Sequence, residues 1–266
     1  MIYQGRTALV TGASAGLGAA YARALADRGA DLVLTARRED RLEALAEELR
    51  ARGRTAQVVA ADLAEPGAPS AILAALPAPP DILVNNAGFG LPGTFAATTW
   101  TEQQRFIQLM LTSYAELAHA ANRHMHGQGW GRIVNVASLA GIAPGSGGHT
   151  LYGAVKAFLI SMSQSLHAEG ERAGVRAQAC CPGFTYTEFH DVNGTRERTR
   201  SMPKALWMEA APVVEGSLDA LEGGPVVFVP GTVNKLLART MRVIGPEASS
   251  RLFAKQAAKF RDTEGL

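Results

Sequence analysis

The sequence predicts an α/β fold in which one doubly wound, parallel sheet of about seven strands carries helices on both faces. Short runs of apolar residues alternate with longer amphipathic stretches along the 266-residue chain. Strands of continuous apolar residues separated by helices indicate a parallel sheet that is covered on both sides. A glycine-rich turn also joins the first expected strand to the first expected helix, as in a nucleotide-binding βα unit.

The elements of this sheet are expected in a regular order. The apolar runs predict strands at 7–12, 31–37, 56–62, 81–88, 131–138, 175–183 and 224–231. The amphipathic stretches predict helices at 16–28, 38–52, 66–76, 101–127 and 152–172. Because no internal repeat or low-complexity linker divides the chain, we expect a single Rossmann-type domain over residues 1–231 and a helical extension over 232–266.

Composition argues against several classes of protein. The net charge is only +2 and no basic run stands out, so no nucleic-acid partner is expected. The two cysteines, Cys180 and Cys181, are adjacent and make a poor structural disulfide, so nothing suggests a secreted scaffold. The N-terminus reaches a strand-like run at once, and no apolar stretch is as long as the roughly 18 residues of a spanning helix. We therefore expect a cytoplasmic protein.

The turn after the first strand reads TGASAGLG over residues 11–18. Glycines allow a tight turn and a close approach of the backbone, and the following helix presents free N–H groups to a phosphate. The spacing is Gly-x3-Gly-x-Gly, which differs from the commoner dinucleotide fingerprint. Its placement between strand and helix predicts a phosphate site, and the alternative is a loop that merely turns.

The second strand ends in Arg37 and Arg38, where an NAD site usually has an acidic residue for the ribose 2′-hydroxyl. Guanidinium groups instead suit a 2′-phosphate, because arginine pairs with phosphate through two hydrogen bonds. This predicts a preference for NADP(H) over NAD(H). The alternative is a solvated charge cluster at the start of a helix.

Tyr152 and Lys156 stand four residues apart in a stretch that reads as a helix, which places both side chains on one face. Ser138 ends the fifth strand, at the edge where open α/β sheets bind ligands. The structural alternative is a helix with a half-buried tyrosine and a lysine whose ammonium reaches solvent. That alternative weakens when the serine and the glycine turn are considered together with the pair.

Five motifs, in order, resemble the short-chain dehydrogenase/reductase superfamily: TGASAGLG (11–18), NNAG (85–88), NVAS (135–138), YGAVK (152–156) and PGFTYT (182–187). The resemblance runs from about residue 5 to 190 and implies an NADP(H)-dependent oxidoreductase that interconverts a carbonyl and an alcohol. It implies that Tyr152 is the general acid and base. Lys156 would lower the pKa of that phenol and hold the nicotinamide ribose, and Ser138 would bind the substrate oxygen.

The resemblance also implies which residues contact the cofactor. The glycine turn would lie at the pyrophosphate, Asp62 and Leu63 by the adenine, and Thr187 at the carboxamide. Asn86 and Gly88 would line the adenosine side. The full expected set is Gly12, Ser14, Gly16, Leu17, Gly18, Arg37, Arg38, Asp62, Leu63, Asn86, Ala87, Gly88, Tyr152, Lys156, Pro182, Gly183, Thr185 and Thr187, and no metal is expected.

The sequence departs from the family at one polar position. Many members carry an asparagine on the long helix before the fifth strand, where it helps to hold a water chain that feeds protons to the lysine; here that position is Met110. A thioether accepts hydrogen bonds only weakly. Backbone and water could carry the relay, Ser113 could substitute one turn on, or the enzyme is slow. The alternative function is therefore a catalytically weak or inactive nucleotide-binding sensor.

The expected substrate is apolar. The segment over about 188–212 is expected to form a lid, the alternative being a surface flap with a helical anchor. Apolar walls are expected from Phe89, Leu91, Phe184 and Phe189. The loop before the catalytic tyrosine is one residue longer than usual, and His149 in that loop either faces the pocket or is solvated.

The stretch 232–266 contains two basic amphipathic patterns, VNKLLARTMRVI and SRLFAKQAAKF. We expect a helix pair that packs on the body or on a neighbouring subunit. A peripheral membrane contact is the alternative, because basic amphipathic helices bind anionic interfaces. By resemblance to the family, a homodimer or homotetramer is expected.

Overall fold

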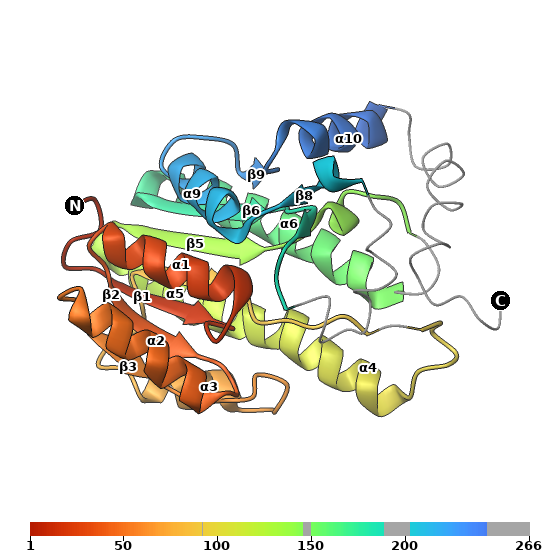
Figure 1. Ribbon diagram of the computed structural model, residues 1–266. Helices are drawn as coiled ribbons and strands as arrows, with labels where there is room; N and C mark the ends of the chain where they lie inside the picture. The colour runs from red at the N-terminus through yellow and green to blue at the C-terminus, as the bar shows by residue number, and fades with distance from the viewer. Residues whose placement is uncertain (92, 146–149, 189–202, 244–266) are drawn as a thin grey trace.

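The computed structural model describes residues 1–91, 93–145, 150–188 and 203–243, and its centre is a seven-stranded parallel sheet (Figure 1). The strand order is β3-β2-β1-β4-β5-β6-β9. The bounds are β1 Thr7–Thr11, β2 Asp31–Thr35, β3 Ala56–Val58, β4 Ile82–Asn85, β5 Gly131–Val136, β6 Val175–Cys180 and β9 Val227–Phe228. Each of the seven predicted strands is present, so the predicted fold class is confirmed.

Helices cover both faces of the sheet. Their bounds are α1 Gly16–Asp27, α2 Glu39–Ala51, α3 Ala68–Ala74, α4 Trp100–Ile107, α5 Tyr114–Gln128, α6 Thr150–Gly170, α9 Ala210–Leu221 and α10 Thr232–Val243. Helices α1, α2 and α9 share one apolar core with the sheet, and α3, α4, α5 and α6 pack on the opposite face (Figure 1).

Strand β1 shows why the sheet needs cover on both sides. Its side chains point alternately to opposite faces, as the period of two requires. Ala8 and Val10 belong to the core on the α1 side, whereas Leu9 belongs to the core on the α5 side. All three are fully buried. The apolar run in the sequence is unbroken because its alternate residues face opposite sides of the sheet, and helices cover each side.

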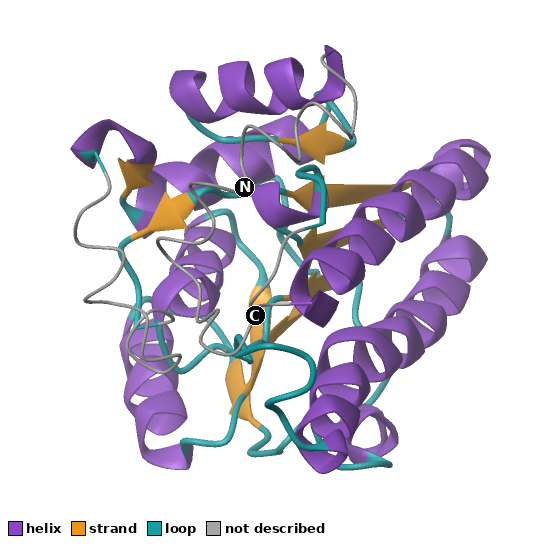
Figure 2. Cartoon of the chain, turned by 90° about the vertical axis from the view of Figure 1, so that its right-hand side faces the viewer, coloured by secondary structure: helices purple, strands orange, loops and turns teal. Residues whose placement is uncertain are grey.

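The strand order reverses at the centre of the sheet, where β1 pairs with β2 on one side and with β4 on the other. In such sheets a crevice opens beyond the carboxyl ends of the strands at this reversal. Figure 2 looks onto this edge of the molecule. Most residues that the sequence nominates for chemistry follow a strand at this edge or lie in the first two turns of the next helix.

Thr11, the last residue of β1, ties this strand to the turn that follows β4. Its hydroxyl donates to the carbonyl of Val84 at 3.2 Å. The same oxygen accepts the backbone N–H groups of Asn86 at 2.8 Å and Ala87 at 2.9 Å. Thr11 is fully buried, so this one hydroxyl provides bonds that water cannot supply.

The long helix predicted over 101–127 is not continuous. A π-helical segment, Gln108–Ser113, separates α4 from α5. A π-helix is wider than an α-helix and is common at functional sites, and apolar periodicity does not reveal it. The segment directs the Ser113 hydroxyl to the carbonyl of Leu63, at 2.7 Å.

Several elements of the C-terminal half were not expected in this form, and helix α9 corresponds to none of the predicted helices. The predicted strand 224–231 has only two residues in ladder geometry, β9. A separate two-stranded sheet joins β7 Phe184–Thr185 to β8 Trp207–Met208. Helix α10 corresponds to the first amphipathic pattern of the C-terminal stretch, whereas the second pattern lies outside the described residues. In the part of the chain that the structure describes, no helix is both long and apolar enough to cross a bilayer.

The exchange Thr11→Val is expected to lower the free energy of unfolding by about 2 kcal/mol, because two buried N–H groups lose their acceptor. Thr35 provides a matched control, since it ends β2 and is equally buried, but its hydroxyl has no hydrogen-bond partner among the described residues. Thr35→Val should therefore be neutral or stabilising. Denaturant unfolding of both variants checks this. Equal losses in the two variants would contradict the role given to Thr11.

Candidate active site

Ser138 lies two residues beyond the end of β5 and begins a short 3-10 turn, Leu139–Gly141. Its Oγ accepts the N–H of Ala140 at 3.1 Å. A hydroxyl that already accepts one bond still has its hydrogen to donate. Gly141 packs directly on helix α6, where an added β-carbon would lie 2.5 Å from the carbonyl carbon of Lys156. The turn and the helix therefore hold Ser138 near the start of α6.

The amine of Lys156 is buried at the same edge of the sheet. Only 4% of the residue is exposed, and its Nζ donates to the carbonyl of Val136, the last residue of β5, at 2.7 Å. The ammonium lies 5.6 Å from the centroid of the Tyr152 ring. Burial lowers the pKa of Lys156 to about 7, because removal from water disfavours the charged form. The predicted pair therefore lies together on α6, with the lysine tied to the sheet.

Tyr114 is a second phenol beside Tyr152, and the sequence reasoning missed it. It begins α5, is fully buried, and its hydroxyl donates to the carbonyl of Ala87 at 2.5 Å. Burial raises the pKa of Tyr114 well above its usual value, and the nearby Tyr152 raises that pKa further. Tyr114 is therefore a neutral phenol that links the NNAG turn to the surroundings of Tyr152.

Met110 fills apolar space under the NNAG turn. It is fully buried, and a β-carbon added to Gly88 would lie 2.8 Å from its sulfur. The substitute that the sequence suggested, Ser113, uses its hydroxyl on Leu63 instead. The hydroxyl that this helix places near Tyr152 belongs to Tyr114, one turn after Met110. The signal in the sequence was a tyrosine on the face of the helix that carries the methionine.

A buried chain of polar side chains fixes the strands beneath the site. The Asn85 amide donates to Asn135 Oδ1 at 2.9 Å and to the carbonyl of Tyr114 at 3.2 Å. Asn135 donates in turn to Ser163 Oγ at 2.9 Å, and Ser163 donates to the carbonyl of Leu159 at 2.7 Å. The chain joins β4, β5, α5 and α6. Asn85 Oδ1 accepts no bond among the described residues, but the other bonds of the chain set the position of α6 relative to the strand ends.

The glycine turn packs on the NNAG segment. A β-carbon on Gly12 would lie 2.8 Å from Ala87 Cα, and one on Gly18 would lie 2.6 Å from Asn86 Nδ2. These two glycines are therefore required by the contact between the β1 and β4 turns. Gly16 faces Thr187 instead, whose Cβ would be 3.0 Å from an added carbon. Gly12 and Gly16 both have a positive φ, +66 and +55, which favours glycine.

The N-terminus of α1 has the features of an anion site. Its N-cap residue, Ala15, offers no side-chain cap, and no acidic residue lies in the first turn. Its first N–H groups and its dipole therefore suit a phosphate group. Leu17, in the first turn, packs against the core of this face.

A cationic cluster lies beyond the end of β2, close to the glycine turn. Arg38 donates to Ser14 Oγ at 3.0 and 3.3 Å, and both Arg38 and Arg41 bind the carboxylate of Glu188. Arg37, which the sequence paired with Arg38, is exposed. Two guanidinium groups and a hydroxyl form a donor set that fits a phosphate, and the carboxylate already there is an anion in that place. Arg41 was missed because it is the third residue of α2, beyond the end of the second strand where the sequence analysis placed the 2′-phosphate site.

The remaining predicted cofactor residues lie around the same edge. Asp62 accepts from Arg105 at 2.9 Å and from the N–H of Ala64 at 3.0 Å, and Leu63 is buried. After β6, Pro182 accepts the N–H of Leu139 at 3.0 Å. Thr185 Oγ1 donates to Gly183 at 3.3 Å, and Thr187 Oγ1 donates to Thr185 at 3.5 Å.

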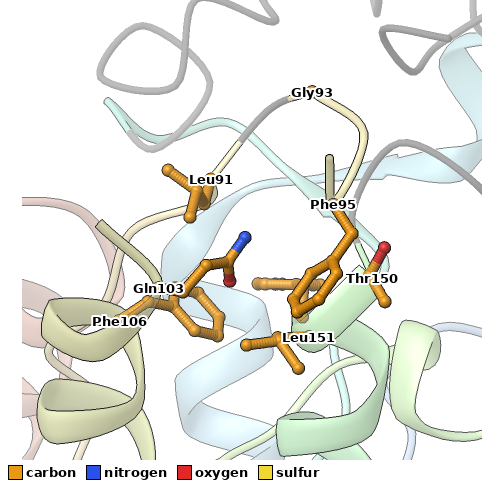
Figure 3. Close-up of a pocket in the computed structure, with 8 residues that line it drawn as sticks. Leu91, Gly93, Phe95, Gln103, Phe106, Thr150 and Leu151 are labelled. Atoms are coloured by element: carbon orange, nitrogen blue, oxygen red, sulfur yellow. The ribbon is translucent and has the colours of Figure 1, made fainter. Parts of the chain in front are cut away.

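A hollow opens to the surface beside Tyr152 (Figure 3). Leu91, Gln103, Phe106 and Leu151 direct their side chains into it from the loop after β4 and from helices α4 and α6. The full lining is Leu91, Gly93, Phe95, Gln103, Phe106, Thr150, Leu151 and Tyr152. The lining is mixed: two leucines and two phenylalanines are apolar, whereas Gln103, Thr150 and Tyr152 are polar. The Gln103 amide donates to Thr98 at 2.6 Å.

Only part of the predicted apolar wall lines this hollow. Leu91 does so, whereas Phe89 packs behind it on Phe106, with ring centroids 5.6 Å apart. Phe184 packs on Trp207 at 5.3 Å, in the small second sheet. Phe189 and His149 lie outside the described residues, as does most of the predicted lid. The described part of the chain holds no group of three or more His, Cys, Asp or Glu side chains placed to bind a metal.

Comparisons with known proteins agree with the motifs. The chain matches the short chain dehydrogenase family over residues 6–198. It is 31% identical over 246 residues to Oxidoreductase UcpA of Salmonella typhimurium, covering 90% of this chain and 93% of that protein.

Two solved structures extend the similarity to three dimensions. A short-chain dehydrogenase from Sphingobium yanoikuyae in complex with NADPH is 36% identical, with a TM-score of 0.80 over 91% of this chain and 93% of that one. A bulky-bulky ketone specific alcohol dehydrogenase from Comamonas testosteroni is 32% identical, with a TM-score of 0.74 over 90% of this chain and 93% of that one.

Replacing Lys156 by methionine should remove a pH dependence of stability. The pKa of Lys156 is about 7 in the folded chain, against about 10.4 when unfolded, so the unfolded chain binds more protons between these values. The lysine therefore destabilises the wild type as pH falls through this window. From pH 7.5 to 9.5, the free energy of unfolding of the wild type should rise relative to Lys156→Met by about 1 kcal/mol per pH unit.

Denaturant unfolding across this pH range measures the difference. Lys235→Met is the control, because Lys235 is exposed and its loss should leave the wild-type slope unchanged. Parallel curves for the wild type and Lys156→Met would show that burial does not depress this pKa.

Proposed function

The chain belongs to the short-chain dehydrogenase family of oxidoreductases, and on this premise we propose that it interconverts a carbonyl and an alcohol on an apolar substrate with NADP(H). The observation that carries the proposal is the Tyr152–Lys156 pair at the carboxyl edge of the sheet, with Tyr152 lining a partly apolar hollow. A phenol that only filled space would not need a buried amine beside it.

In this proposal Tyr152 protonates the carbonyl oxygen during reduction and accepts the proton in the reverse direction. A free phenol has a pKa of about 10, and an adjacent ammonium lowers the pKa of a phenol toward the working pH. Ser138 donates its hydroxyl hydrogen to the same substrate oxygen, since its Oγ already accepts the N–H of Ala140. The nicotinamide ring would supply or accept the hydride when bound.

Lys156 would serve both the phenol and the cofactor. In the cofactor-free chain its pKa is lowered to about 7 by burial. Hydroxyl groups and negative charge brought by a dinucleotide would favour the charged form of the lysine. The ammonium then stabilises the phenolate of Tyr152 as the proton leaves. The bond to Val136 holds the amine in place for this role.

The cofactor preference rests on the cationic cluster. Ser14, Arg38 and Arg41 would hold a 2′-phosphate, and the N-terminus of α1 would hold the pyrophosphate. The similar protein from Sphingobium yanoikuyae was solved with NADPH, which supports a nicotinamide cofactor of this kind. The rest of the contact set inferred from the motifs belongs to the same proposal.

The substrate class rests on the hollow. Leu91, Phe106 and Leu151 offer an apolar surface, and Gln103 offers one amide to orient a polar group. The similar alcohol dehydrogenase from Comamonas testosteroni is described as specific for bulky-bulky ketones. The apolar side chains of the lining and this relative together favour a bulky apolar ketone or secondary alcohol over a sugar or a small acid.

The second candidate function is a nucleotide-binding sensor without useful turnover. Met110 favours it, because a thioether stands where many members of the family carry a proton-relay asparagine. Four other expectations stay predictions. They are the division into a domain over 1–231 and an extension over 232–266, the cytoplasmic location, the homodimer or homotetramer, and the alternative membrane contact of 232–266.

A panel of ketones and alcohols assayed with NADPH and NADH tests the proposal directly. Wild-type turnover is expected to be fastest with NADPH and a bulky ketone. Tyr152→Phe should lower kcat by about a hundredfold or more, because the proton donor is lost, while NADPH affinity changes little. Clear cofactor binding without turnover on any compound would favour the sensor.

The size of the hollow gives a separate prediction. Leu91→Trp should fill it, and kcat/KM should fall about tenfold or more for a bulky ketone but little for a small one. Equal losses for large and small ketones would show that the substrate binds elsewhere. NADPH affinity, measured by fluorescence titration, is the control and should not change.

A further inference from the structure

The expected 2′-phosphate site holds an anion from the chain itself. Glu188 Oε2 lies 2.8 Å from Arg38 Nη1, and its Oε1 lies 2.6 Å from Arg41 Nη1. Each carboxylate oxygen thus binds a different guanidinium. Arg38 simultaneously donates to Ser14 Oγ. The carboxylate therefore takes the donors that a phosphate would need.

The segment 184–188, which carries Glu188, contacts the structure at two places, the small second sheet and the glycine turn. Phe184 and Thr185 pair with Trp207 and Met208 in the small second sheet. Thr187 then lies against Gly16, at the N-terminus of α1. The chain thus runs from the second sheet over the glycine turn to Arg38, and Glu188 ends this path.

The carboxylate of Glu188 resembles part of a phosphate group, because both are negatively charged and both present two oxygen acceptors close together. Hydrogen bonds from Arg38, followed by those from Arg41, lower the pKa of Glu188 below its usual value. The carboxylate is therefore ionised at neutral pH. A dianionic phosphate cannot share these two guanidinium groups with it without repulsion between the anions.

We propose that Glu188 is an internal competitor for the 2′-phosphate and thereby determines the cofactor specificity of this protein. In the cofactor-free chain it occupies Arg38 and Arg41, and it must leave them before a 2′-phosphate binds. A cofactor with a 2′-hydroxyl brings no competing charge and leaves Glu188 in place. The wild-type preference for NADPH over NADH is therefore smaller than the arginines alone would give. This inference rests on the proposed NADP(H) function.

The size of the effect follows from exposure. The side chains of Arg38, Arg41 and Glu188 are 40%, 45% and 42% exposed, so each ion pair is partly screened by solvent. Removing the competition should therefore tighten NADPH binding by about five- to tenfold. The gain should shrink as salt rises, because salt screens exposed charges.

The test compares Glu188→Gln with the wild type by calorimetric or fluorescence titration. NADPH should bind about five- to tenfold more tightly to the variant, and NADH should change by less than about twofold. The probes 2′,5′-ADP and 5′-AMP should repeat this contrast without a nicotinamide. Glu39→Gln is the matched control, because Glu39 opens α2 and is exposed, but none of the described ion pairs includes it. Thermal unfolding verifies that each variant is folded.

The outcomes separate the inference from the function. Unchanged or weaker NADPH binding by Glu188→Gln would overturn the inference, as would equal tightening of NADPH and NADH. Either result with a wild type that binds NADPH would leave the proposed function intact. A wild type that binds neither NADPH nor NADH would overturn both.

Discussion

The ammonium of Lys156, held against the carbonyl of Val136 inside the protein, is the interaction on which the rest of the site depends. A buried amine is tolerated only where polar groups and neighbouring elements fix it, since burial penalises its charged form. Here β5 provides the carbonyl and α6 provides the amine. The Asn85–Asn135–Ser163 chain holds these two elements in one relative position. Tyr152 is placed as a consequence, one turn before the lysine on the same helix.

The NNAG turn connects the Tyr152–Lys156 pair to the glycine turn after β1. On one side Ala87 donates its N–H to the Thr11 hydroxyl, and the glycine turn packs on Asn86 and Ala87. On the other side Ala87 accepts the hydroxyl of Tyr114, which lies beside Tyr152. A single tight turn therefore sets both the position of the glycine turn and the environment of the Tyr152 phenol. Met110 closes the space beneath that turn with apolar contact, so the site is organised here by Tyr114.

Much of this arrangement could be predicted from the sequence, because it depends on local patterns. The seven strands follow from apolar runs, whereas the roles expected of Ser138, Tyr152 and Lys156 come from the ordered motifs that resemble the family. The features that escaped prediction depend on tertiary contacts. Tyr114 reads as an ordinary core aromatic, and the π-helical segment leaves the apolar periodicity almost unchanged. Glu188 meets Arg38 across 150 residues of sequence, which no local pattern encodes.

The central claim is that this edge transfers hydride from a bound nicotinamide to a ketone carbon while Tyr152 supplies the proton. The most direct measurement is the mass of the alcohol formed from a bulky apolar ketone with NADPH deuterated at nicotinamide C4, using each of the two C4 epimers. The account predicts one deuterium at the carbinol carbon with one epimer and none with the other. Alcohol without deuterium from either epimer, or no alcohol despite NADPH binding, would contradict it.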